Sequence, residues 1–222
     1  MGKLIVFEGT DGSGKSTQFE LLAKRLEAEQ IGFQRLRFPQ YEEPSSALIR
    51  MYLGGAFGDD PEAVNAYAAS TFYAVDRYAS YQRVWKDYYQ GGGFVVSDRY
   101  TTSNAVHQGS KVPEAERAEF FRWLYDLEYD RMGLPRPDLV VLLDMPVELS
   151  EQLMRKREQS TGTHADIHER NEDYLKKCRD VALQAAKYYG WRTVSCAKDG
   201  AIRGVEDIHE EVYAIVKSCL ED

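Results

Sequence analysis

The chain has 222 residues and a formal net charge of −8 at pH 7. Polyanion binding depends on a basic surface that releases counterions, so this acidic balance argues against a nucleic-acid partner. The longest apolar run, at residues 139–143, is too short to cross a bilayer. The three cysteines are widely spaced and form no CxxC pair, which indicates cytosolic thiols. We therefore expect a cytoplasmic protein whose partners are small molecules.

The first predicted elements are a strand, a helix and a second strand. Residues 4–7 form an unbroken apolar run, which is typical of a strand buried on both faces of a parallel sheet. Apolar residues then recur at helical spacing after Thr17, and Gly32 marks the end of that helix. Residues 33–38 are predicted to be the next strand, which Pro39 closes.

A long helix and a third strand follow. Asp60 is a residue type that caps helices and Pro61 suits the first helical position, so a helix is predicted over about 61–90. Three consecutive glycines end this helix, and residues 94–96 form the third strand.

The C-terminal half continues the alternation of strands and helices. Its predicted elements are a helix over about 114–131, a strand at 139–143, two helices within 147–189, a strand at 191–196 and an amphipathic helix from Val205. Residues 159–163 form a polar break, which we interpret as the tip of a helical lid at about 150–172. This order predicts one α/β domain over residues 1–222, a three-layer sandwich in which a parallel five-stranded sheet carries helices on both faces.

A glycine-rich loop links the first predicted strand to the first helix. Residues 9–16 match G-x-x-x-x-G-K-[ST], the P-loop pattern, in the structural context that this pattern requires. Its glycines let successive N–H groups point at phosphate oxygens, Lys15 is expected to bridge the β- and γ-phosphates, and Ser16 to ligate Mg²⁺. A glycine turn that merely joins strand and helix is the alternative. The residues predicted to bind ATP are Gly9, Thr10, Asp11, Gly12, Ser13, Gly14, Lys15, Ser16 and Thr17.

Side chains suited to a ligand site also follow the other predicted strands. Phe38 and Pro39 follow the second strand, Asp98 and Arg99 the third, and Asp144 the fourth. Ligands of open parallel sheets bind beyond the carboxyl ends of the strands, so we expect these residues at the site. A structural ion pair is the alternative interpretation of Asp98 and Arg99, but their position at a strand end favours a functional role.

With these motifs in place, the chain resembles the thymidylate kinase family of P-loop nucleoside-monophosphate kinases, from residue 4 to the C-terminus. The resemblance is carried by motifs that are together far more specific than the phosphate loop alone. They are residues 7–18, Phe38-Pro39, residues 73–77, Asp98-Arg99-Tyr100 with Ser103-Asn104, residues 137–146 and residues 166–169.

The resemblance implies how an acceptor nucleotide is held. Asp11 would meet the sugar 3′-hydroxyl or the magnesium cluster, and Arg99 would bind the acceptor phosphate. Tyr73 would stack on the base, Arg77 would hydrogen-bond a thymine carbonyl, and Asn104 would contact the base edge. The implied acceptor-binding residues are Asp11, Phe38, Pro39, Tyr41, Tyr73, Arg77, Arg99, Asn104, His107, Asp166 and Glu169.

The resemblance also implies a catalytic arginine, which family members carry either in the phosphate loop or in the lid. This phosphate loop contains no arginine, so Arg155 and Arg157 before the polar break are similar to the lid alternative. A solvated basic helix face is the other interpretation. Asp98 would hold a water of the Mg²⁺ shell. The implied catalytic residues are Lys15, Asp11, Arg99, Arg155 and Arg157, and the metal-binding ones are Ser16 and Asp98.

Two positions depart from the family pattern. Many relatives have an arginine after Phe-Pro that grips the acceptor phosphate, whereas this chain has Gln40 and Tyr41. His107 stands near the position where an aromatic residue commonly senses the missing 2′-hydroxyl of the sugar. A packed polar histidine is an equally good interpretation of His107.

The predicted reaction is phosphorylation of dTMP by ATP with Mg²⁺, in a homodimer if the family resemblance extends to assembly. Two alternatives remain at this point. A deoxynucleoside kinase would attack through an uncharged 5′-hydroxyl and need a general base, for which Glu8 is the candidate near the loop. A regulatory nucleotide-binding module would bind ATP without transferring phosphate.

Overall fold

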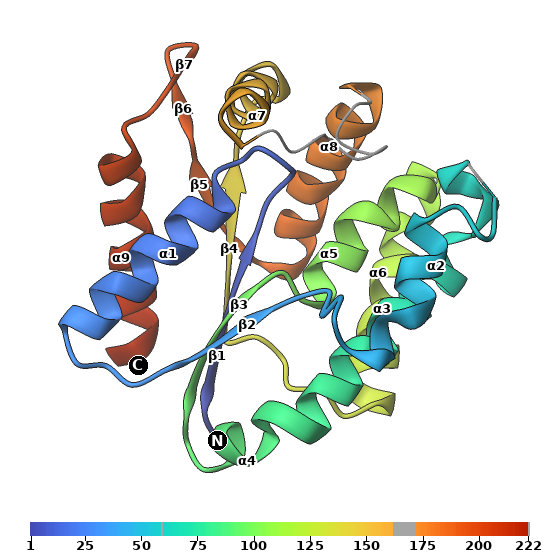
Figure 1. Cartoon of the computed structure of the whole chain (residues 1–222), viewed down its shortest axis with the longest axis horizontal. Coiled ribbons are helices and arrows are strands. Elements are labelled where there is room, and N and C mark those ends of the chain that lie inside the picture. Colours follow the sequence, from blue (N-terminus) through green and yellow to red (C-terminus); the bar gives the residue numbers. More distant parts are fainter. Residues whose placement is uncertain (59, 162–171, 222) are drawn as a thin grey trace. The chain divides into compact units, whose positions relative to one another are not determined.

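A five-stranded sheet organises the chain, and the computed structural model describes residues 1–58, 60–161 and 172–221 (Figure 1). The strands are β1 (Lys3–Glu8), β2 (Gln34–Arg37), β3 (Phe94–Asp98), β4 (Leu139–Asp144) and β5 (Arg192–Ser195), in the order β2-β3-β1-β4-β5. The β2–β3 and β4–β5 pairs are parallel. The predicted α/β fold with a five-stranded parallel sheet is confirmed.

The chain divides into two compact units. Unit 1 comprises residues 1–6 and 32–138, and unit 2 comprises residues 7–31 and 139–222. The predicted ATP-binding residues 9–17 therefore lie in unit 2, whereas Tyr73 and Arg99 lie in unit 1. The single domain over 1–222 stays a prediction, and each unit is described below by itself.

Unit 1 surrounds strands β2 and β3 with helices and short helical turns. The helices are α2 (Ala47–Leu53), α3 (Ala66–Ser80), α4 (Lys86–Gln90), α5 (Thr101–His107) and α6 (Arg117–Tyr125). The 3₁₀ turns are η1 (Pro44–Ser46), η2 (Pro61–Ala63), η4 (Gly109–Lys111) and η5 (Glu114–Glu116), and the π-helical segments are η3 (Tyr81–Trp85) and η6 (Asp126–Arg131). Trp85 and Tyr100 are fully buried in its core, with ring centroids 6.3 Å apart.

The long helix predicted over 61–90 is divided into several elements. Asp60 caps only a single 3₁₀ turn, because its carboxylate accepts the N–H of Glu62 and the chain becomes extended again at Val64. The side chain of Asn65 then accepts the N–H of Ala68 at 2.8 Å and starts α3. The predicted helix start at Pro61 is therefore wrong, and the capping residue of the long helix is Asn65.

Unit 2 packs four helices around β4 and β5. They are α1 (Lys15–Ala28), α7 (Val147–Thr161), α8 (Glu172–Tyr189) and α9 (Val205–Glu221), and a small hairpin pairs β6 (Ala197–Lys198) with β7 (Ala201–Ile202). Helix α9 packs on β4, β5 and α1, while α8 packs on β4; Figure 1 shows α1 beside α9. The sequence did not indicate the hairpin.

The helices of the predicted lid begin in an apolar cluster of unit 2. Val147 and Met154 of α7 pack with Leu175 of α8, and all three side chains are buried. Helix α7 continues through Thr161, and residues 162–171, which include the last two residues of the predicted lid tip at 159–163, lie outside the described residues. Within the described part of the chain, no helix combines the length and apolar character needed to span a membrane.

Candidate active site

The phosphate loop of unit 2 is closed by its own lysine. The Lys15 ammonium group donates to the carbonyl oxygens of Gly9 at 2.6 Å and Thr10 at 3.1 Å, and the N–H of Ser13 donates to Thr10 at 3.2 Å. These bonds curl residues 9–15 into a turn that leads into α1. Ser16 and Thr17, in the first turn of α1, are exposed. The helix N-terminus thus presents its unbonded N–H groups where an anion can bind.

Two glycines of the loop are required by close packing. A Cβ at Gly12 would lie 2.7 Å from the carbonyl oxygen of Ser150 and 2.9 Å from the side chain of Met154, both in α7. A Cβ at Gly9 would lie 2.9 Å from the carbonyl oxygen of Leu143 at the end of β4. Gly12 also has φ +76°, which disfavours any other residue. The loop therefore rests directly on β4 and on the first half of α7.

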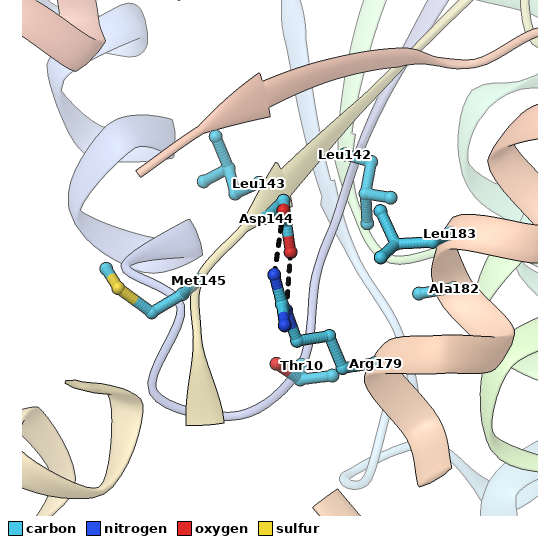
Figure 2. A pocket seen from close by; sticks show the side chains of 8 residues that line it. All are labelled: Thr10, Leu142, Leu143, Asp144, Met145, Arg179, Ala182 and Leu183. Carbon is cyan, nitrogen blue, oxygen red and sulfur yellow. Dashed lines mark hydrogen bonds and ion pairs between the residues drawn. The ribbon is translucent and has the colours of Figure 1, made fainter. Parts of the chain in front are cut away.

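An ion pair beside the loop was missed by the sequence reasoning. Arg179 of α8 makes two hydrogen bonds to Asp144 at the end of β4, from Nε at 2.7 Å and from Nη2 at 3.1 Å. Figure 2 shows this pair beside Thr10 of the phosphate loop in one small pocket. Asp144 was expected at the site, but its partner lies 35 residues further along the chain, where the sequence offers no signal.

Removing the positive charge of Arg179 should weaken ATP binding. The guanidinium balances the Asp144 carboxylate, which otherwise repels a polyphosphate held by the adjacent loop. We expect Arg179→Gln to raise the KM for ATP about tenfold, with a smaller change for the acceptor, and Asp144→Asn to reverse most of this change in the double variant. Steady-state kinetics with each substrate varied in turn measures the effect.

A matched control for that experiment is Arg136→Gln. Arg136 pairs with Asp130 at 2.7 Å, but both side chains are more than half exposed. Such surface pairs contribute little, so this variant should keep wild-type constants. Equal KM values for ATP in Arg179→Gln and wild type would contradict the charge-balance argument.

In unit 1, Arg99, which is predicted to bind the acceptor, has an unusual backbone conformation. It follows β3 with φ +69°, a region that non-glycine residues seldom adopt and that is common at functional sites. The Ser97 hydroxyl donates to the carbonyl oxygen of Arg99 at 2.6 Å, and the next residue, Tyr100, is fully buried. Arg99 Nη1 lies 2.9 Å from Nε2 of His107 and 3.4 Å from the Ser103 hydroxyl.

Tyr73 of α3 lies near the same charged group. Burial raises the pKa of its phenol, to which Tyr41 and Tyr52 also contribute, whereas the positive charges of Arg99 and Arg77 act in the opposite direction. These interactions place Tyr73 within electrostatic reach of Arg99. Its hydroxyl therefore stays protonated at neutral pH, and its stacking on a base stays a prediction.

The segment after β2 is fixed to α3. The Phe38–Pro39 peptide bond is cis, and the N–H of Phe38 donates to the carbonyl oxygen of Asp98 at 3.0 Å. The fully buried Asp76 carboxylate accepts the N–H of Gln40 at 2.8 Å and the Ser45 hydroxyl at 2.7 Å. Tyr41, which follows, is half exposed.

Arg77 and Asn104 belong to a buried polar network. Arg77 makes two hydrogen bonds to Glu128, at 2.6 and 2.5 Å, and neither side chain is more than 2% exposed. Glu128 also accepts from Thr101 at 2.8 Å and from the Asn104 amide at 3.3 Å, and that amide donates to the carbonyl oxygen of Ser70 at 3.0 Å. Glu128 was not indicated by the sequence. In this network Arg77 and Asn104 both have a structural role. Their predicted contact with the base of the acceptor nucleotide stays a prediction.

Loss of the Glu128 charge should destabilise unit 1. Burial lowers the pKa of Arg77, whereas the Glu128 carboxylate raises it. A guanidinium is not deprotonated in proteins, so Arg77 stays charged after the substitution and loses its compensating carboxylate. We expect Glu128→Gln to lower the free energy of unfolding by about 3 kcal/mol, measured by urea denaturation. Asp130→Asn, which removes an exposed carboxylate from the same region, is the control and should change it little. Equal stability of the two variants would contradict this assignment.

The predicted metal ligands are Asp98 in unit 1 and Ser16 in unit 2. One carboxylate oxygen of Asp98 forms an ion pair with Arg37 at 3.2 Å, whereas the other, Oδ1, is buried and has no hydrogen-bond partner among the described residues. Such an atom suits a cation or its bound water. Among the described residues, no group of three or more His, Cys, Asp or Glu side chains could hold a metal.

The predicted lid residues are only partly described. Arg155 of α7 has a side chain 74% exposed and pairs weakly with Glu151 at 3.4 Å. Arg157 lies within α7, but its side chain is outside the described part, as are Asp166 and Glu169 altogether. Asp11 is half-buried in the phosphate loop. The roles of these residues stay predictions.

A glycine-rich phosphate loop between a parallel strand and a helix, with its lysine turned into the loop, defines a P-loop nucleotide-binding protein. The comparisons with known proteins agree. The model of the thymidylate kinase family matches residues 7–212. Thymidylate kinase from Mycobacterium tuberculosis is 33% identical over 190 residues, 85% of this chain and 87% of the relative. A probable thymidylate kinase from Thermococcus gammatolerans is 32% identical over 221 residues, 98% of this chain and 97% of the relative.

A solved structure is similar in fold. Thymidylate kinase from Candida albicans has a TM-score of 0.72 with 22% sequence identity, and the match covers 98% of this chain and 92% of that one. On the family match and the sequence identities, the chain belongs to the thymidylate kinase family, whose members are phosphotransferases.

Proposed function

We propose that this protein transfers the γ-phosphoryl group of ATP to the 5′-phosphate of dTMP, giving ADP and dTDP. The observation that carries the proposal is the family match over residues 7–212, which includes the phosphate loop of unit 2 and the acceptor-side residues Tyr73 and Arg99 of unit 1. A donor site and an acceptor site are the two parts that such a transfer requires.

The transfer needs little proton chemistry. An oxygen of the acceptor phosphate attacks the γ-phosphorus, and the bond from that phosphorus to the oxygen of ADP breaks. A phosphate monoester has a second pKa near about 6, so it is mostly dianionic at neutral pH and needs no general base. Lys15 and the loop amides hold the donor, Arg99 holds the acceptor phosphate, and positioning with electrostatic stabilisation supplies most of the acceleration.

Magnesium fits the residues proposed for it. Ser16 would hold the ion through its exposed hydroxyl, and Asp98 would hold one of its waters through the unpartnered Oδ1. When bound, Mg²⁺ would neutralise part of the charge on the donor phosphates. Asp11 would meet either the acceptor sugar or this cluster.

A lid arginine would complete the charge stabilisation. Arg155 is the better described candidate, because its side chain is exposed and its Nη2 lies 3.4 Å from the carboxylate of Glu151. Such a cation can be worth about 10³ to 10⁵ in rate when it reaches the transferring group. The second candidate for this arginine is Arg157. Asp166 and Glu169, also in the lid region, are proposed to bind the acceptor.

Assembly and location are proposed from the family and the composition. We expect a cytoplasmic homodimer, for which light scattering should give a mass near twice the 25.4 kDa of one chain. A monomeric mass at assay concentration would contradict the dimer without affecting the reaction.

A coupled assay with ATP and a panel of acceptors tests the function. The acceptors are dTMP, dUMP, the other deoxynucleoside monophosphates and thymidine, each measured with and without Mg²⁺. We expect the highest kcat/KM with dTMP, no turnover of thymidine and no turnover without the metal ion.

Two other results of this assay would indicate a different function. Turnover of thymidine but not dTMP would indicate a deoxynucleoside kinase. Glu8, the base that such an enzyme would need, is buried and accepts the N–H of Gly9 at 2.9 Å, which gives that reading no support. Binding of ATP without transfer to any acceptor would indicate a regulatory module.

A further inference from the structure

A buried carboxylate of α3 is bonded to the segment that follows β2. The side chain of Asp76 is 1% exposed, and its two oxygens accept from two different places in that segment. Oδ2 accepts the N–H of Gln40 at 2.8 Å, and Oδ1 accepts the Ser45 hydroxyl at 2.7 Å. Both donors are neutral groups. Asp76 is thus bonded near both ends of residues 40–46, which we call the 40–46 segment.

An arginine of α2 closes the same segment into a turn. Nη1 of Arg50 donates to the carbonyl oxygens of Tyr41 and Glu43, to the latter at 3.1 Å, and to the Ser46 hydroxyl at 2.6 Å. These bonds hold the parts of the 40–46 segment to one another. The bonds to Asp76 attach the closed turn to α3, so they decide where the turn lies along that helix.

Asp76 shares one side of α3 with Tyr73, the residue predicted to stack on the base. The two residues are three positions apart in the helix, so their side chains are neighbours on its surface. Tyr41, in the 40–46 segment, contributes to the raised pKa of Tyr73, which places the two phenol groups within electrostatic reach of each other. A shift of the segment along α3 would therefore move Tyr41 relative to Tyr73.

Burial makes the attachment through Asp76 specific. A carboxylate forms stronger hydrogen bonds than a neutral acceptor, and a buried carboxylate is unfavourable when its donors are withdrawn. The folded protein therefore favours the one arrangement in which Gln40 and Ser45 both reach Asp76. Because the segment is already ordered in this way, a ligand that contacts it loses little free energy in fixing its position.

From this geometry we infer that Asp76 is a positioning residue, which holds the 40–46 segment on α3 so that Tyr41 stands beside Tyr73 for the acceptor nucleotide. The inference rests on the proposed function, since that function assigns both tyrosines to the acceptor. Asp76 is itself buried and acts through the segment. Its loss should therefore weaken the binding of dTMP and leave the binding of ATP unchanged.

Two substitutions separate the hydrogen bonds of Asp76 from its charge. Asp76→Ala removes both acceptors. Asp76→Asn can keep both bonds, because its amide oxygen accepts the N–H of Gln40 and its amide nitrogen donates to the Ser45 hydroxyl, which can also accept. We expect Asp76→Ala to raise the KM for dTMP about tenfold with the KM for ATP unchanged, and Asp76→Asn to stay within about threefold of wild type. Steady-state kinetics with each substrate varied in turn measures both constants.

The control is Asp87→Ala, which removes an exposed carboxylate from α4 in the same unit and should keep wild-type constants. Equal changes of the two KM values in Asp76→Ala would indicate a general structural loss and overturn the inference. An Asp76→Asn variant as impaired as Asp76→Ala would also overturn it, because charge rather than position would then matter. If Asp76→Ala does not fold, as judged by thermal melting, Ser45→Ala takes its place. It removes one of the two bonds and should raise the KM for dTMP alone, by about threefold.

A double-variant cycle tests the route of the effect. In a Tyr41→Ala background, Asp76→Ala should cause little further loss of dTMP binding, because the side chain that it positions is absent. Calorimetry with dTMP measures the four affinities of the cycle. Additive losses in the double variant would overturn the inference.

Proteolysis tests the position of the segment without using activity. Glu42 is exposed within the 40–46 segment, so a glutamate-specific protease can cleave there when the segment leaves α3. We expect cleavage after Glu42 to be at least about tenfold faster in Asp76→Ala than in wild type, as measured by mass spectrometry of the fragments. Equal rates would overturn the inference. A wild-type protein that does not phosphorylate dTMP would defeat the proposed function, whereas faster cleavage in Asp76→Ala would still support the attachment of the segment by Asp76.

Discussion

Replacing Lys15 with alanine is expected to reduce phosphoryl transfer at least about 10⁴-fold at saturating ATP and dTMP. The lysine has two tasks in the same loop. Its ammonium group closes the turn through the carbonyl oxygens of Gly9 and Thr10, and it supplies the positive charge proposed to bridge the β- and γ-phosphates. Alanine removes both the bonds and the charge. Single-turnover kinetics measures the loss of the chemical step.

Two controls separate these tasks. Lys15→Met keeps the aliphatic stem, so a similar loss in this variant would assign the effect to the ammonium group rather than to packing. Lys24→Ala removes an exposed lysine from the same helix, α1, and should leave activity unchanged. Activity of Lys15→Ala within tenfold of wild type would contradict the proposed role of the phosphate loop.

Arg99→Ala should give the second largest effect, a loss of about 10³-fold in kcat/KM for dTMP. We expect the KM for dTMP to rise and kcat to fall, because Arg99 would bind the acceptor phosphate both before and during the transfer. The KM for ATP should change little. Steady-state kinetics with each substrate varied at saturating levels of the other separates these effects.

The control for Arg99 is another arginine of unit 1. Arg83 is 70% exposed and reaches Glu43 only at 3.5 Å, so Arg83→Ala removes the same charge from the surface and should leave both KM values unchanged. A kcat/KM for Arg99→Ala close to that of wild type would discard its assignment to the acceptor phosphate.

The sequence by itself determined the sheet and the phosphate loop. Both depend on signals between neighbouring residues: unbroken apolar runs give buried strands, and a fixed spacing of glycines before Lys15 gives a turn of inward-facing N–H groups. The predicted start of the helix at Pro61 was wrong, because two capping residues, Asp60 and Asn65, compete within six positions and the chain becomes extended between them.

Only the tertiary structure decided which partner each site arginine has. Arg77 pairs with Glu128, which is 51 residues away in the sequence, and Arg179 pairs with Asp144, which is 35 residues away. Arg99 contacts the imidazole of His107, the last residue of α5. Every arginine is alike in the sequence, whatever side chain it contacts in the folded protein. The difference arises because distant elements bring particular side chains within hydrogen-bond distance, and hydrogen bonding and charge neutralisation act only over such short distances.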